Sequence, residues 1–218
     1  MNHLETNNNL AAEQFGFRTS FSTEQAFFNF IDNILNKLQK KNHVGGIFLD
    51  LQKAFDCVNH DILLNKLSFY GITGGFFQLI KTYLQDRYQR VILNNNYFTS
   101  TSDWGQITHG VPQGSILGPL LFLLYRNDLP HSINKNNKIV LFADDTSLII
   151  SNPVRIKFRD DANKILQHIQ EWFNANLISL NWEKTHFMHF TTKNNSSNNF
   201  DIMYKDKKLT AGNSVNLA

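Results

Sequence analysis

Hydrophobic residues recur every three or four positions in two stretches of the chain, which is the spacing of one face of an α-helix. In the first stretch these positions are Phe27, Phe30, Ile31, Ile34 and Leu38. In the second they are Phe158, Ala162, Ile165, Leu166, Ile169, Trp172 and Phe173. Both stretches therefore predict amphipathic helices. Thr23 can cap the start of the first one, and Glu24 suits its first turn.

Short apolar runs predict the strands. Residues 47–49 form one such run, which follows two glycines and ends at Asp50. Residues 139–143 and 146–150 form two more, and only the pair Asp144-Asp145 separates them. Two β-prone runs around two residues are typical of a tight hairpin, so we expect this pair to form its turn.

Further elements lie between these and after them. One helix is expected near Asp61, capped by that residue and ended by Gly71, and another from about Gly114 towards Asn127. Residues 186–192 alternate enough to form a strand, with Phe187 and His189 on one face.

The order strand, helix, hairpin, helix, strand is the split βαβ, or ferredoxin-like, arrangement. We therefore predict an α+β fold for the central part of the chain. Residues 193–199 are expected to form a polar loop, and residues 200–218 one short hairpin.

Composition narrows the class of protein. The 218 residues are 42% hydrophobic and 13% aromatic, which fits a globular protein. The net charge of +3 is compatible with a nucleic-acid partner but does not require one. A single cysteine, Cys57, excludes an intramolecular disulfide framework and indicates a reducing compartment. The longest apolar stretch, residues 116–125, is far shorter than the roughly 20 residues of a membrane span, so no membrane partner is expected.

The adjacent carboxylates of Asp144 and Asp145 are the most informative pair in the sequence. Hairpin turns favour Asn-Gly or Asp-Gly, and two neighbouring negative charges repel each other. A divalent metal ion beside them would offset that repulsion. A solvated surface turn is the alternative.

Asp50 adds a third carboxylate, because it follows another apolar strand and open sheets commonly present ligands at strand ends. Oxygen ligands favour Mg²⁺ or Mn²⁺ over zinc. Two such ions can hold both the attacking and the leaving oxygen of a phosphoryl transfer. The residues thus indicate metal-dependent phosphoryl chemistry.

Five segments together resemble the reverse transcriptases of non-LTR retrotransposons (LINE-type, jockey-like). Residues 48–56 (FLDLQKAFD) look like the first palm motif of that family. The second, third and fourth are similar to residues 110–115 (GVPQGS), 142–145 (FADD) and 180–185 (LNWEKT), and the fingers-to-palm segment to residues 14–18 (QFGFR). The motifs occur in the family's order and spacing from about residue 10 to residue 190.

The resemblance implies a polymerase palm with a ferredoxin-like sheet and partial helical fingers. Residues 1–44 would be the fingers part, 45–192 the palm, and 193–218 an incomplete tail. The upstream Arg-Pro-Ile segment and the downstream primer grip and thumb of the family are absent from the sequence, so we expect a chain truncated at both ends.

The resemblance also assigns roles to residues. Asp50, Asp144 and Asp145 would hold two metal ions, Mg²⁺ or Mn²⁺, with no small-molecule cofactor. Lys184 would protonate the departing pyrophosphate, although an exposed, solvated lysine is the alternative. Phe55 would lie under the nucleotide sugar and collide with a 2′-hydroxyl. A core-filling ring at this position is compatible with that role.

Other residues would contact nucleotide or nucleic acid. Gln113 and Gly114 would lie along the incoming nucleotide and the template base, with a simple turn as the alternative. Lys53 would contact phosphate or pair with a carboxylate. The basic residues Arg18, Arg87 and Arg90 would bind nucleic acid, with a solvated charged face as the alternative.

Two further observations concern single residues. Arg126 replaces what is usually an apolar residue in the family, and a buried guanidinium without partners would be costly. His60 and His109 have no metal-ligand spacing around them and are expected to be ordinary hydrogen-bonded histidines.

The function implied is RNA-directed DNA polymerisation, in which deoxynucleoside triphosphates extend a DNA primer on an RNA template. We expect an intracellular location, in the nucleus, the cytoplasm or both. The main alternative is a nucleic-acid-binding remnant of the same fold that no longer polymerises. A phosphotransferase of the haloacid dehalogenase type would need a second Asp where Gln52 stands.

Overall fold

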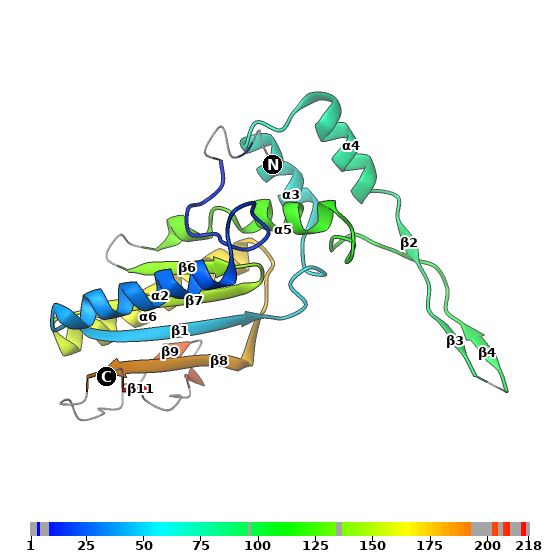
Figure 1. Ribbon diagram of the computed structural model, residues 1–218. Helices are drawn as coiled ribbons and strands as arrows, with labels where there is room; N and C mark the ends of the chain where they lie inside the picture. Colours follow the sequence, from blue (N-terminus) through cyan, green and yellow to red (C-terminus); the bar gives the residue numbers. More distant parts are fainter. Residues whose placement is uncertain are drawn as a thin grey trace. The chain divides into compact units, whose positions relative to one another are not determined.

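The computed structural model describes residues 4, 9–95, 97–133, 137–192, 202–204, 207–209 and 215–216 (Figure 1). The chain forms two compact units, one from residues 1–54 and 126–218 and the other from residues 55–125. Each unit is a group of residues that contact one another more than they contact the rest of the chain. The expected borders between fingers, palm and tail stay predictions.

A five-stranded sheet forms the centre of the first unit. Its strand order is β11-β8-β1-β7-β6, and its bounds are β1 (His43–Leu51), β6 (Lys138–Phe142), β7 (Asp145–Asn152), β8 (Leu180–Thr191) and β11 (Val215–Asn216). Strand β1 is antiparallel to β7 on one side and to β8 on the other, and β11 is parallel to β8. The four long strands therefore have the predicted ferredoxin-like arrangement.

Two helices cover opposite faces of this sheet, as Figure 1 shows for α2 (Thr23–Gln39) and α6 (Arg155–Ala175). Phe30 of α2 packs against Phe48 of β1. Gly45, three residues earlier on β1, faces Phe158 of α6 on the other side. Side chains of a strand alternate between faces, so residues 48 and 50 point to the α2 side and residues 45 and 47 to the α6 side.

Both helices follow the predicted apolar pattern. Helix α6 buries six of its seven expected positions, and α2 buries Phe30 and Ile34. Phe27 was expected on the apolar face of α2 but is 67% exposed. The cap of α2 is Ser22, one residue earlier than the expected Thr23. The Ser22 hydroxyl accepts the Gln25 backbone amide, and the Gln25 side chain accepts the Ser22 backbone amide in a capping box.

The hairpin of β6 and β7 is present, but its turn is not the predicted one. Phe142 pairs with Asp145, so the two residues between the strands are Ala143 and Asp144. Ala143 has a φ of 53°, the left-handed conformation that tight hairpin turns require. Asp145 is thus the first residue of β7, and the turn lies one residue earlier in the chain than the sequence indicated.

The end of the chain contains the expected short hairpin, formed by β9 (Met203–Tyr204) and β10 (Lys207–Lys208). The loop expected at residues 193–199 lies outside the described residues.

The second unit contains three helices and two short two-stranded ribbons. The helices are α3 (His60–Phe69), α4 (Gly74–Leu84) and α5 (Leu117–Arg126), whose last residue belongs to the first unit. The strands are β2 (Tyr88–Gln89), β3 (Ile92–Asn94), β4 (Thr99–Thr101) and β5 (Gly105–Gln106), paired as β2 with β5 and β3 with β4. A 3₁₀ turn, η1 (Leu129–Ser132), follows in the first unit.

The helix starts of this unit differ slightly from expectation. The cap of α3 is Asn59, whose side chain accepts the Ile62 amide, and not Asp61. Helix α5 begins at Leu117, three residues after Gly114, because residues 112–115 form a turn closed by the Ser115 side chain. Gly71 follows the end of α3 with a φ of 77°, as predicted. Within the described ranges, no helix combines the length and apolar character needed to cross a membrane.

Candidate active site

Asp50 and Asp145 lie at the same end of two neighbouring antiparallel strands. The ladder between β1 and β7 pairs Phe48 with Ser147 and Leu49 with Thr146. Asp50 is the next residue on β1, and Asp145 is the next residue in the opposite direction on β7. The register therefore brings these two carboxylates side by side, and Asp144 follows in the adjoining turn.

The charges of the three carboxylates act on one another. Partial burial raises the pKa of Asp145, and the negative charges of Asp144 and Asp50 raise it further. The positive charge of Arg126 acts in the opposite direction. Like charges shift a pKa in this way only at short range, so this end of the sheet concentrates negative charge.

The donors present are all oxygens, which suits Mg²⁺ or Mn²⁺. In the part of the chain that the structure describes, no group of three or more His, Cys, Asp or Glu side chains is already arranged around a metal position. The chemistry of the three carboxylates therefore fits hard divalent cations, and their side chains would have to close around such an ion.

Lys184 lies beside Asp50, with 3.9 Å between its Nζ and Oδ2 of Asp50. The cause is an irregularity in the β1–β8 ladder: Phe48 pairs with His186, but Asp50 pairs with Asn181. Residues 182–185 thus bulge out opposite one residue of β1. The buried hydroxyl of Thr185 donates to the Asn181 carbonyl and closes this bulge. Bulges commonly redirect a side chain next to an active site.

This bulge was not predicted, because the sequence indicated a strand beginning only at residue 186. Strand β8 begins at Leu180 and includes the whole fourth motif. The bulge explains the structural role of the fourth motif, because it directs Lys184 towards Asp50.

Two other basic residues of the first unit have different surroundings. Lys53 is exposed and has a φ of 47°, two residues after the end of β1. Arg18 donates to the carbonyls of Ala11 and Gln14, and its guanidinium lies 4.3 Å from the centre of the Phe21 ring. Arg18 therefore holds its own segment together. The nucleic-acid contact of Arg18 and the phosphate contact of Lys53 stay predictions.

In the second unit, the end of the first motif lies against the start of the second. The Val111 amide donates to the Phe55 carbonyl at 2.9 Å, and the Gln113 side chain donates to the Asp56 carboxylate at 3.0 Å. The Phe55 ring is half-buried and stacks on Phe122, with 4.6 Å between ring centres. Phe55 thus has the core contact that the sequence allowed, and its role toward a nucleotide sugar stays a prediction.

Asp56 is a residue that sequence reasoning left without a role. Its carboxylate orients Gln113, the residue that the resemblance places along the nucleotide. The signal available was its place in the first motif, but no spacing rule links residues 56 and 113. Gly114 next to Gln113 is exposed, has a φ of 77° and has open space around it, so a positive φ explains this glycine better than close packing does.

The histidines of this unit behave as expected. His60 bonds the Gly110 carbonyl through Nε2 at 2.8 Å, and His109 bonds Asn59 and Thr108. Both are ordinary hydrogen-bonded residues.

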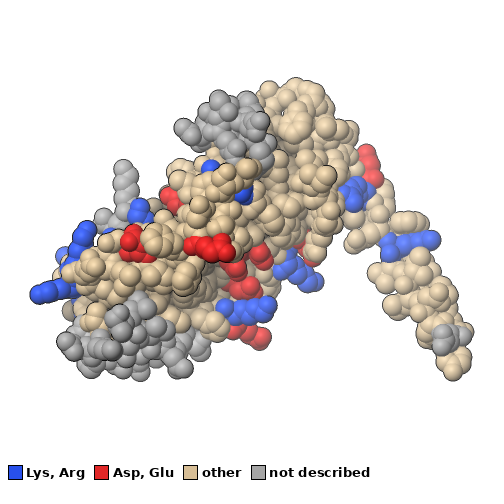
Figure 2. Space-filling model, viewed as in Figure 1, with Lys and Arg blue, Asp and Glu red and all other residues tan. Residues whose placement is uncertain are grey.

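The basic residues of the ribbons lie against aromatic rings. The Arg87 guanidinium is 5.6 Å from the Tyr83 ring centre, and that of Arg90 is 4.7 Å from Trp104. Figure 2 shows basic side chains near β2, while the outer ribbon of β3 and β4 is mostly uncharged on the visible face. Binding of nucleic acid by Arg87 and Arg90 stays a prediction.

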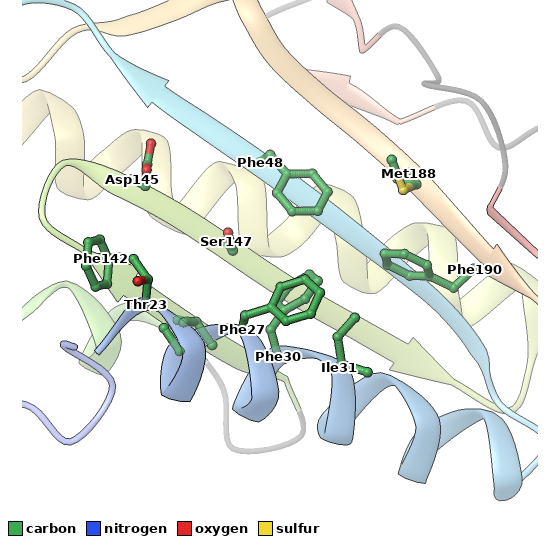
Figure 3. A pocket seen from close by; sticks show the side chains of 12 residues that line it. Thr23, Phe27, Phe30, Ile31, Phe48, Phe142, Asp145, Ser147, Met188 and Phe190 are labelled. Carbon is green, nitrogen blue, oxygen red and sulfur yellow. The ribbon is translucent and has the colours of Figure 1, made fainter. Parts of the chain in front are cut away.

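An apolar pocket of about 510 Å³ opens beside Asp145, between α2 and the sheet. Figure 3 shows Asp145 and Phe142 toward one end of the pocket and Met188 and Phe190 toward the other. Phe27 and Phe30 of α2 line it from the helix side. Its lining has few polar groups, so the carboxylate is the main polar feature of this face.

Arg126 lies directly beneath the turn that carries the aspartates. It is fully buried, and Nη1 donates to the Ala143 carbonyl at 2.5 Å while Nη2 donates to the Thr146 hydroxyl. These two hydrogen bonds reduce the cost that the sequence raised for a guanidinium without partners.

Comparisons with known proteins show the family of the chain. Residues 1–209 match the family described as reverse transcriptase (RNA-dependent DNA polymerase). The chain is 31% identical over 183 residues to a probable RNA-directed DNA polymerase from transposon X-element of Drosophila melanogaster. The aligned region covers 83% of this chain and 20% of that protein. It is 32% identical over 189 residues to the RNA-directed DNA polymerase from mobile element jockey of Drosophila funebris. This aligned region covers 82% of this chain and 20% of that protein.

Among solved structures, the chain resembles apo telomerase from Candida tropicalis truncated from its C-terminal domain. The TM-score is 0.58 at 15% identity, and the match covers 88% of this chain and 38% of that one. At this identity the likeness concerns the fold alone. The chain spans about a fifth of the length of the retrotransposon relatives that it matches.

Proposed function

This chain belongs to the reverse transcriptase (RNA-dependent DNA polymerase) family, and from that premise we propose that its three converging aspartates catalyse RNA-directed DNA synthesis. The single observation that carries the proposal is the register that brings Asp50 beside Asp145 at one end of the sheet. The substrates are a DNA primer on an RNA template and deoxynucleoside triphosphates. The site of action is intracellular, in the nucleus or the cytoplasm.

In this proposal Asp50, Asp144 and Asp145 hold two Mg²⁺ or Mn²⁺ ions. Such ions, when bound, activate the primer 3′-hydroxyl and neutralise charge on the departing pyrophosphate. The primer 3′-hydroxyl would lose its proton to solvent as its oxygen attacks the α-phosphorus, and the bond to pyrophosphate would break. Lys184 is 3.9 Å from Asp50 and donates a proton to that leaving group.

Residues of the second motif bind the nucleotide in this proposal. Gln113, oriented by Asp56, lies along the incoming nucleotide, and Gly114 accommodates the template base. Phe55 excludes a ribose 2′-hydroxyl through its ring, whose position is supported from behind by stacking on Phe122. Lys53 contacts a triphosphate oxygen, and Arg18, Arg87 and Arg90 contact the nucleic acid backbone.

Primer extension on poly(rA)/oligo(dT) with Mg²⁺ or Mn²⁺ tests the chemistry. The parent chain should extend the primer, and the Asp144→Ala and Asp145→Ala variants should not, although all three remain folded by circular dichroism. Extension that survives both substitutions would contradict the assignment of the carboxylates. Binding of the primer–template without extension by the parent would instead support the nucleic-acid-binding remnant.

Sugar selection tests the role of Phe55 separately. Replacing Phe55 by Val should raise incorporation of ribonucleotides relative to deoxynucleotides, because a smaller side chain leaves room for the 2′-hydroxyl. Phe69→Val, at a ring of α3 that is 86% exposed, is the matched control and should leave the preference unchanged. An unchanged preference in Phe55→Val, with extension retained, would assign the ring to packing alone.

A further inference from the structure

Arg126 is a cation enclosed in the core at the C-terminal end of α5. It is among the largest fully buried side chains of the described residues, with an exposed fraction of 0%. A charge in such a place is stable only if it is well paired, so its partners indicate its purpose.

Those partners bracket the two aspartates. Nη1 donates to the carbonyl of Ala143, the residue before Asp144, and Nη2 donates to the hydroxyl of Thr146, the residue after Asp145. Ala143 holds the left-handed conformation of the turn, and Thr146 is 1% exposed. The planar fork of the guanidinium thus spans the turn from its buried side.

The charge of Arg126 is directed at the same carboxylates. Burial lowers the pKa of Arg126 to about 10, and the negative charges of Asp144 and Asp145 oppose that shift. The side chain is therefore protonated at neutral pH. A positive charge on one side of the turn faces the two negative charges that the proposed function assigns to metal binding.

We propose that Arg126 is a positioning residue that acts as an internal counter-cation, so that it holds the Asp144–Asp145 turn together before divalent metal binds. The inference rests on the proposed function, because it concerns the same carboxylates. Its consequence is that Arg126 competes electrostatically with the metal. Removing the charge should make the turn less stable without metal and its affinity for metal higher.

Metal binding gives the first test. Free Mn²⁺ is measured by electron paramagnetic resonance during titration of the parent, Arg126→Gln and Arg126→Lys. Arg126→Gln should bind Mn²⁺ on the order of 3- to 10-fold more tightly than the parent, and Arg126→Lys should stay close to it. Arg159→Gln, at an exposed arginine that pairs with Asp160, removes the same net charge elsewhere and should leave Mn²⁺ affinity unchanged.

A double-mutant cycle without metal gives the second test. Asp145→Asn should raise the melting temperature in the Arg126→Gln background, where it relieves an unbalanced repulsion, and should lower it or leave it unchanged in the parent background. This arm needs no metal. If the parent binds no Mn²⁺ that Asp145→Asn removes, the metal part of the proposed function fails, while the cycle still reports whether Arg126 balances Asp145.

The opposite results overturn the inference. Equal Mn²⁺ affinity in the parent and Arg126→Gln, or additive effects in the cycle, would reduce Arg126 to a packing residue. If Arg126→Gln does not fold, Arg126→Met gives the same neutral comparison. Folding of these neutral variants only with added Mn²⁺ would support the inference. If the neutral variants fail to fold both with and without Mn²⁺ while Arg126→Lys folds, metal cannot replace the cation. That result would contradict the inference.

Discussion

The backbone of Gly16 lies directly against the backbone of Ala143. A Cβ atom on Gly16 would lie 2.1 Å from the Ala143 nitrogen, a distance that no side chain tolerates. The contact arises because residues 13–15 run along the edge strand β6, where Phe15 donates to the Leu141 carbonyl and Leu141 donates to that of Glu13, both at 2.8 Å. The segment that precedes α2 is thereby fastened to the turn that carries the aspartates.

We expect Gly16→Ala to destabilise the chain by about 3 kcal/mol or more, because the obstructing atoms are backbone and cannot rotate away. Either the segment leaves β6 or the 143–144 turn moves, so primer extension should fall with stability. Thermal unfolding and primer extension measure the two effects. Gly75→Ala is the control, since a Cβ there meets nothing within 4 Å, and it should be neutral or stabilising by up to about 1 kcal/mol. Parental stability in Gly16→Ala would mean that the segment does not dock on β6 in solution.

Gly45 illustrates a different constraint, since its obstacles are side chains. A Cβ at Gly45 would lie 2.6 Å from the ring of Phe187 and 2.9 Å from that of Phe158. Both rings are fully buried, so neither can move freely. We expect Gly45→Ala to lower the free energy of unfolding by about 1–3 kcal/mol, measured by denaturant titration.

A compensating substitution tests that cause. Phe187→Leu removes ring atoms that a Gly45 Cβ would meet, so the double variant should be more stable than the sum of the two single effects predicts. Simple additivity would show that the loss in Gly45→Ala arises elsewhere.

Lys184 should matter for catalysis and hardly for stability. Its side chain is 71% exposed, so the ion pair with Asp50 contributes only about 0–1 kcal/mol to folding. If it protonates pyrophosphate, Lys184→Ala should slow single-nucleotide incorporation by about 100-fold or more. Lys157→Ala, at an exposed lysine of α6, is the matched control. Equal incorporation rates in both variants would assign Lys184 to the solvated surface that the sequence left as its alternative.

Much of the fold could be predicted because it depends on period and order. The apolar spacing of residues 158–173 predicted α6, and the runs around Asp144 predicted the hairpin, since each pattern has one favourable way to bury its apolar face. Strand order then followed from the alternation of elements. The convergence of Asp50 with Asp145 required only that β1 and β7 be neighbours.

The features that sequence reasoning missed depend on local backbone geometry. The hairpin turn is Ala143–Asp144 because Phe142 pairs with Asp145. The sequence does not reveal this shift of the turn by one residue, because Asp144 and Asp145 are identical and either could be the last residue of the turn. The bulge at residues 182–185 has no period to reveal it, and it is visible only in the ladder between β1 and β8.

The exact helix caps and the partners of Arg126 were missed as well. Ser22 lies one residue before the expected cap Thr23, and Asn59 lies two residues before the expected cap Asp61. Both have side chains that cap a helix equally well. The sequence indicated a cost for Arg126 and could not supply its partners, which lie 17 and 20 residues further on.

His189 should make stability depend on pH. Burial, together with the nearby His43 and Arg155, lowers its pKa to about 4. The two histidine rings lie 6.5 Å apart, and His189 also packs near Phe158. A proton on His189 would therefore face an apolar ring and other positive groups, so the fold favours the neutral form.

The sign follows from proton uptake. In the unfolded chain His189 titrates near its ordinary value of 6.5, so between about 6.5 and about 4 the unfolded state binds more protons. The stability from neutral His189 is fully present above pH 6.5 and is lost as the pH falls towards 4. After a discount for partial exposure to solvent, the loss is about 1–2 kcal/mol. His189→Gln should flatten the dependence of melting temperature on pH across this interval, whereas His131→Gln, at an exposed histidine, should not. An equally steep dependence in His189→Gln would assign the acid sensitivity to other groups.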